Sequence, residues 1–153
     1  TREARPMPGS TLCDFKETAK GGGAGKVSAF QNADTIKKLA EDALAILATL
    51  EPGEDPELRL TLQDVEALAR LGLYCAHKFR AAIYLEQKKR DEARDCMAEA
   101  YGHWKKYTTL MSSLYRGVEL QRNRALPDWH AYDSEALKDF TDLGGGGTPE
   151  PPK

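Results

Sequence analysis

The sequence predicts an all-α fold, an up-down-up bundle of three main helices with a short fourth helix closing one end. Three long stretches of the 153-residue chain carry apolar residues at spacings of three and four, the period of an amphipathic helix. Only a short polar break separates the second stretch from the third, so these two helices should pack antiparallel. With 41% hydrophobic and 30% charged residues, the chain should fold in water.

The first main helix is predicted from about Ala33 to Leu50. Asn32 or Asp34 can cap its first turn. The stretch from Glu51 to Pro56 should end it, because proline cannot continue the backbone hydrogen bonds of a helix. Its apolar residues are Ile36, Leu39, Ala40, Ala43, Leu44, Ile46, Leu47 and Leu50.

The second main helix is predicted from about Leu62 to Gln87, with Thr61 or Asp64 as its cap. Gly72 lies inside it and should mark a close crossing by a neighbouring helix, because glycine otherwise weakens a helix by up to about 1 kcal/mol. The expected inward stripe is Val65, Leu68, Ala69, Gly72, Cys75, Ala76, Phe79, Ala82 and Ile83.

The third main helix is predicted from about Glu92 to Tyr115, capped by Asp91. The short fourth helix should run from Glu135 to about Leu143, capped by Asp133 or Ser134. The third helix carries the inward stripe Ala93, Met97, Ala100, Tyr101, Trp104, Tyr107, Met111, Leu114 and Tyr115.

The two ends differ in composition from the middle of the chain. Residues 1–28 form a flexible N-terminal segment in this interpretation, residues 29–143 the helical bundle domain, and residues 144–153 a Gly/Pro-rich tail. A short ordered piece is expected around Leu12 to Phe15. The chain starts with Thr1 and not with methionine, so we expect a processed form or a piece of a longer protein.

The charge balance excludes two classes of partner. With 22 basic and 24 acidic residues, the chain has no electrostatic basis for binding nucleic acid or an anionic membrane surface. No stretch approaches the roughly 18 apolar residues that a membrane span requires.

Three widely spaced cysteines, Cys13, Cys75 and Cys96, argue against a disulfide framework or a zinc site.

No catalytic, cofactor or metal site is predicted. The glycine-rich run before Lys26 fails the phosphate-loop pattern, because Lys20 replaces its first glycine and Val27 follows the lysine. The histidines lack zinc spacing or a paired Glu-x-x-His motif and are interpreted as structural: His77, His103 and His130. Ser112 and Ser113 lie mid-helix without the glycine elbow of a nucleophile.

Aromatic residues supply the candidate contact site. Those on the third helix follow its inward stripe and are expected in the core. Trp129 and Tyr132, with His130 between them, lie on an irregular segment and are the better candidates for contact with a carbohydrate or a partner, although packing over the bundle end is the competing interpretation.

Two segments resemble a known family. The stretch 64–82, with Leu71-Gly72-Leu73-Tyr74 and then Ala76 and Lys78, is similar to a helical region of large bacterial polysaccharide-degrading enzymes of the α-glucuronidase-like and related glycoside hydrolase kind. So is His103-Trp104-Lys105-Lys106-Tyr107, and the resemblance extends over roughly residues 30 to 140. Cys75 departs from it, because a tyrosine is common there. The resemblance implies a scaffold role, with the catalytic centre on a separate barrel domain.

The first hypothesis is therefore a non-catalytic accessory domain of a periplasmic or extracellular glycoside hydrolase. It would bury an apolar patch against the catalytic domain of the same polypeptide or against a second copy of itself. The alternative is a free-standing helical adaptor that binds a peptide or a partner helix. A third idea is a carbohydrate-binding module that uses Trp129 and Tyr132.

Overall fold

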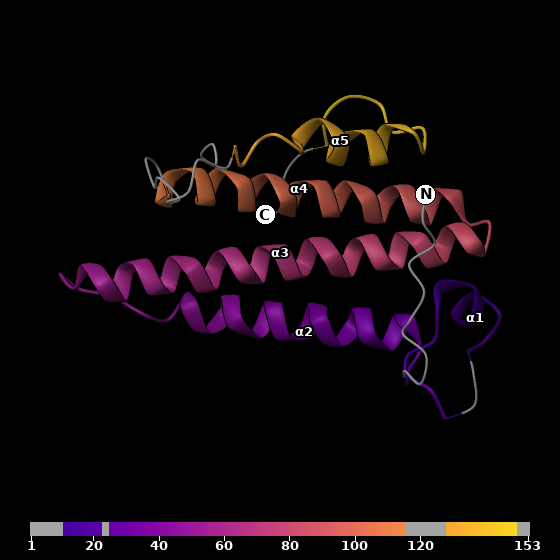
Figure 1. Ribbon diagram of the computed structural model, residues 1–153, viewed down its shortest axis with the longest axis horizontal. Coiled ribbons are helices and arrows are strands. Elements are labelled where there is room, and N and C mark those ends of the chain that lie inside the picture. Colours follow the sequence, from indigo (N-terminus) through magenta and orange to yellow (C-terminus); the bar gives the residue numbers. More distant parts are fainter. Residues whose placement is uncertain (1–10, 23–24, 116–127, 150–153) are drawn as a thin grey trace, which may run out of the picture.

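The computed structural model describes residues 11–22, 25–115 and 128–149, and these parts form an all-α structure. Figure 1 shows α2 (Ala29–Leu47), α3 (Pro56–Glu86) and α4 (Arg90–Leu114) side by side, with α3 in the middle. The short helix α5 (Asp133–Thr141) lies on α4, and α1 (Phe15–Ala19) lies against α3 near the start of α2. The predicted all-α bundle with a short last helix is confirmed.

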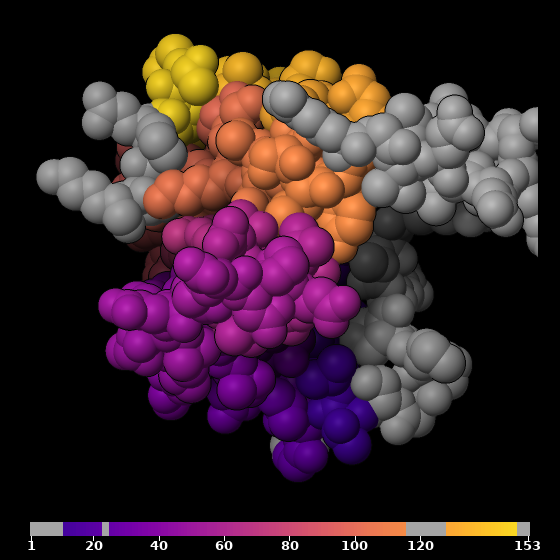
Figure 2. Space-filling view, turned by 90° about the vertical axis from the view of Figure 1, so that its left-hand side faces the viewer, coloured from indigo at the N-terminus to yellow at the C-terminus, as the bar shows by residue number. Residues whose placement is uncertain are grey.

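The three long helices form a flat layer. α3 packs against both α2 and α4, whereas the backbones of α2 and α4 do not approach each other closely. The end view of Figure 2 shows the same order, with violet α2 below magenta α3, then orange α4 and yellow α5. In the part of the chain that the structure describes, this layer leaves faces of α2 and α3 without a neighbouring helix.

The first two long helices start earlier than predicted. Ser28 caps α2: its hydroxyl accepts from Gln31 N at 3.1 Å, and the Gln31 side chain accepts from Ser28 N at 2.9 Å. Asp55 caps α3 and Pro56 occupies its first turn, where no backbone N–H is needed. The predicted caps in these helices are therefore wrong, because local capping chemistry outweighs the start of the apolar pattern: Asn32, Asp34, Thr61 and Asp64.

The two later helices also differ from prediction at their starts. Asp91 lies in the first turn of α4 and does not cap it, and Lys89 takes that place without a side-chain hydrogen bond. Asp133 and Ser134, the two predicted caps of the last helix, are likewise inside α5, after the capping residue Tyr132. Asp133 does not cap α5 because its carboxylate is turned towards α4.

Small residues allow the helices to approach closely. The buried core is rich in alanine, and a Cβ added to Gly72 would lie 3.5 Å from Ala40 Cβ and 3.7 Å from Ile36 Cγ2. The close crossing expected at Gly72 is confirmed. A second core cluster joins α3, α4 and α5: Ala81, Ala93, Met97, Ala100 and Phe140.

Part of the predicted inward stripe is exposed. Leu39 and Ile46 on α2 are 65% and 61% exposed, and Leu68 on α3 is 67% exposed. Ala67, Leu73 and Ala81, which the stripe omitted, are buried. The prediction assumed one inward face for each helix. α3 instead contacts α2 on one side and α4 on another, so its buried surface points in two directions.

Candidate functional site

The three candidate contact residues lie next to one another before α5 in different surroundings. Trp129 is half-buried, with its ring centroid 6.4 Å from Tyr107 and 6.2 Å from Tyr115. Its indole Nε1 is buried and has no hydrogen-bond partner among the described residues. Tyr132 is 60% exposed, and His130 is exposed but hydrogen-bonded.

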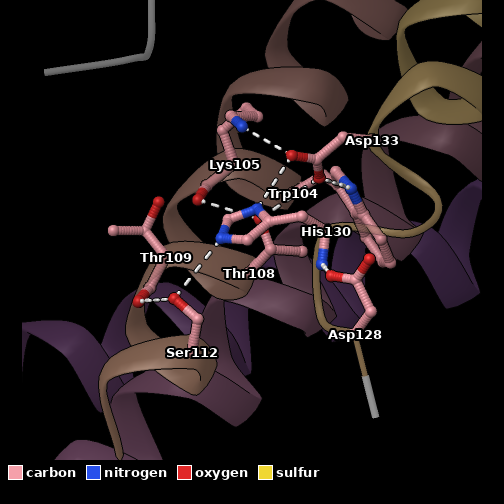
Figure 3. Close-up of polar contacts among 8 residues, drawn as sticks. All are labelled: Trp104, Lys105, Thr108, Thr109, Ser112, Asp128, His130 and Asp133. Carbon is pink, nitrogen blue, oxygen red and sulfur yellow. Dashed lines mark hydrogen bonds and ion pairs between the residues drawn. The ribbon is translucent and has the colours of Figure 1, made fainter. Parts of the chain in front are cut away.

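Asp133 is the centre of a polar cluster that joins α5 to α4 (Figure 3). Its carboxylate accepts hydrogen bonds from Trp104 Nε1 at 2.8 Å and Lys105 Nζ at 2.6 Å. Thr108 Oγ1 lies 3.3 Å from it, and His130 Nδ1 lies 2.9 Å from it. Four side chains from two segments therefore converge on one carboxylate, which we call the Asp133 cluster.

The cluster stabilises the ionised form of its carboxylate. Burial of Asp133 works in the opposite direction, but hydrogen bonds from Lys105, His130 and Trp104 outweigh it and hold the pKa of Asp133 below its ordinary value. The carboxylate is therefore charged at neutral pH and anchors α5 electrostatically.

A serine extends the cluster into the hydrogen-bond order of a hydrolase triad. Ser112 Oγ lies 3.3 Å from His130 Nε2, and His130 Nδ1 in turn contacts Asp133. The Ser112 hydroxyl, however, donates to the Thr109 carbonyl at 2.9 Å. Ser112 also lies inside α4, where backbone N–H groups are used by the helix and cannot form an oxyanion hole. The arrangement therefore serves to hold the segment before α5 against α4.

A pair of stacked imidazoles lies between α3 and α4. The rings of His77 and His103 have centroids 5.6 Å apart and an interplanar angle of 20°. Burial is the main cause that lowers the pKa of each ring to about 4, and for His103 the neighbouring His77 is the next cause. The Nδ1 atom of His103 is buried without a hydrogen-bond partner among the described residues. Both rings are therefore neutral at physiological pH.

The described residues contain no group of three or more His, Cys, Asp or Glu side chains placed to hold a metal ion.

None of the helices in the described ranges has the length and apolar character needed to cross a bilayer.

Several large apolar side chains on α2 and α3 are exposed. Leu39 and Ile46 are seven residues apart and share one side of α2, and Val65 and Leu68 share one side of α3. Ala40 of α2 and Ala69 of α3 pack in the same core cluster, and Leu39 and Leu68 directly precede them. In an antiparallel pair of helices, the residues that precede two facing residues lie on the same side of the pair. These four residues define the α2–α3 apolar face: Leu39, Ile46, Val65 and Leu68.

The chain itself covers a continuation of this face. Phe79 lies eleven residues, or three turns, after Leu68 on the same side of α3. The ring of Phe15 in α1 packs on it, with the centroids 5.8 Å apart. A short helix thus covers one end of this side, and among the described residues no helix covers the end with Leu68 in the same way.

Sequence reasoning missed the Asp133 cluster, and it expected an apolar patch without assigning it to residues of α2 and α3. Ser112 and His130 are eighteen residues apart, so no local motif could join them. Asp133 was recognised only as a possible helix cap.

Comparisons with protein-family models, with curated proteins and with solved structures found no match.

Proposed function

We propose that this chain is a non-catalytic helical domain of a larger carbohydrate-degrading enzyme, and that it docks on a neighbouring domain of the same polypeptide through the α2–α3 apolar face. The observation that carries the docking role is the exposure of three aliphatic side chains on this face: Leu39, Ile46 and Leu68. The enzyme context rests on the resemblance of residues 64–82 and 103–107 described above.

The size of the face supports a partner in the same polypeptide. Its four side chains offer an apolar area on the order of a few hundred Å², the scale of a functional patch. A standard stable interface buries about 800 Å² on each partner. A linked domain needs less area, because linkage supplies a high effective concentration. The other end of the same side, covered by α1, indicates that a helix carrying an aromatic or aliphatic residue fits there.

The proposal is tested in the natural polypeptide by hydrogen exchange. The double variant Leu39→Glu/Leu68→Glu should increase amide exchange along α2 and the first half of α3, because the charged face cannot stay docked. Leu85→Glu is the matched control, since Leu85 is 45% exposed near the far end of α3. Equal exchange in both variants would exclude docking through this face.

Two measurements on the isolated chain complete the test. Sedimentation should show a monomer at micromolar concentration, and a tight dimer would identify a second copy as the occupant instead. Assays against plant and algal polysaccharides should give no turnover, and robust hydrolysis would refute the non-catalytic assignment.

A further inference from the structure

A pocket between α3, α4 and α5 combines aromatic rings with charged groups. Its volume is about 330 Å³, and its lining residues are Tyr74, Lys78, Trp104, Tyr132, Glu135, Ala136 and Asp139. That volume lies at the lower end of the range of roughly 300–1,000 Å³ for small-molecule sites, so it suits a ligand of about one ring. None of these residues belongs to α2 or to the apolar face.

Three aromatic rings line the pocket: Tyr74 and Trp104 are held by their neighbours, and Tyr132 is exposed to solvent. Tyr74 and Trp104 pack with ring centroids 5.1 Å apart, and the Trp104 indole is held by its hydrogen bond to Asp133 at 2.8 Å. Tyr132 is 60% exposed, so its ring is open to a ligand. Aromatic rings of this kind stack on the apolar C–H face of a sugar and place it by their rigid surfaces.

The polar groups of the pocket favour a neutral hydroxylated ligand. Lys78 Nζ lies 2.7 Å from Asp139 and 5.4 Å from the ring centroid of Tyr74. Lys78 Nζ also donates to the Tyr74 hydroxyl at 3.0 Å, so a cation already lies at the hydroxyl edge of this ring and its charge opposes that of an ammonium ligand. The two carboxylates of Glu135 and Asp139 oppose an anionic ligand. Carboxylates accept and an ammonium donates hydrogen bonds, so together they match the hydroxyl groups of a sugar.

Glu135 supplies an unused acceptor. Its carboxylate is exposed and makes no hydrogen bond or ion pair with the described residues, whereas Asp139 pairs with Lys78. Glu135 and Asp139 are one helical turn apart on α5 and so face the same side. An acceptor beside an exposed ring is the arrangement that binds one face and one hydroxyl edge of a pyranose.

We propose that the pocket of Tyr74, Trp104 and Tyr132 binds one sugar residue of a neutral glycan, with Tyr132 stacking on the sugar ring and Glu135 accepting from a hydroxyl. This site goes beyond the docking role and involves none of the residues of the apolar face. Loss of sugar binding and loss of domain docking are therefore separate results.

The chain carries its own internal control for a binding experiment. It has two tryptophans, of which Trp104 lines the pocket and Trp129 packs between Tyr107 and Tyr115. We would titrate the isotope-labelled protein with D-glucose, D-xylose, D-galactose, D-mannose and xylotriose and follow the two indole N–H signals by NMR. The Trp104 signal should shift with a Kd of about 1–10 mM for at least one sugar, and the Trp129 signal should not.

Variants identify the contacts. Tyr132→Ala should weaken binding about tenfold or more, whereas Tyr132→Phe keeps the ring and should stay within about threefold of the native protein. Glu135→Gln should weaken binding severalfold, and the exposed Glu57→Gln on α3 should leave it unchanged. The Trp129 signal checks that each variant is folded.

Three results would overturn the proposal. The first is the absence of a saturable Trp104 shift with every sugar. The second is tighter binding of tetramethylammonium than of any sugar, which would define a cation site. The third is native affinity in both Tyr132→Ala and Glu135→Gln, which would place the sugar elsewhere.

Discussion

Acidification should destabilise this protein through its stacked histidine pair. His77 and His103 have a pKa of about 4 in the folded chain against 6.5 when unperturbed. Above pH 6.5 both rings are neutral in the folded and unfolded states, and the stability is fully present. Between pH 6.5 and 4 the unfolded chain binds protons that the folded chain does not, so the free energy of unfolding falls as the pH falls.

The groups around the two histidines explain why their pKa values are lowered. Desolvation is the main cause for both rings, and for His103 the next causes are His77, Arg70 and Lys106. Cations beside His77 act in the same direction, and Glu41 opposes them weakly. At about 1.36 kcal/mol for each pKa unit, the fall from 6.5 to about 4 corresponds to at most about 3.4 kcal/mol for one ring. Because both rings keep some solvent contact, we discount this to roughly 1–2 kcal/mol for His103.

Urea unfolding at several pH values between 7 and 4.5 measures this effect. His103→Gln should flatten the fall in unfolding free energy by roughly 1–2 kcal/mol relative to the native chain. Lys38→Gln on α2, with a side chain 73% exposed, is the control and should follow the native profile. The quantity compared between the proteins is the slope of unfolding free energy against pH, and not the unfolding free energy at neutral pH. Parallel profiles for the native chain and His103→Gln would refute the reasoning.

Three further predictions concern α3, α4 and α5. In the same urea experiment, Asp133→Asn should lower the unfolding free energy by about 2 kcal/mol, because the ion pair with Lys105 is lost. The exposed control Asp142→Asn should change the unfolding free energy by less than about 0.5 kcal/mol. Gly72→Ala should raise it by about 0.5–1 kcal/mol, because the new methyl group meets Ala40 at an ordinary 3.5 Å and the helix gains propensity; a fall in melting temperature would contradict this. Ser112 should not react with a fluorophosphonate probe, and an adduct at Ser112 seen by mass spectrometry would show an activated nucleophile.

The helices could be predicted from the sequence because their apolar period is a local property. Their starts could not, since the choice of Ser28 over Asn32 depends on a capping box with Gln31. Burial was predicted well in α4, where Ala93 and Met97 are in the core. It failed on Leu68, because periodicity shows that a helix has an apolar side but not whether a neighbour covers it.

The candidate site was visible only in part. Tyr132 was selected because it lies on an irregular segment, and the structure places it at a pocket. Tyr74 and Glu135 were not selected, because they meet only when α5 lies on α4 and α3. Asp133 contributes to holding α5 on α4, and one carboxylate among many carries no sequence signal for such a role.

The separation of the α2 and α4 backbones by α3 affects how the molecule should unfold. Helices that contact only their immediate neighbours behave like the units of a one-dimensional array, in which unfolding of the unit at one edge destabilises mainly the next unit. Opening of α2 should therefore leave α4 and α5 protected against hydrogen exchange. The chain would then open the helix that carries Leu39 and Ile46 in a sub-global step, while the aromatic pocket at the opposite edge keeps its shape.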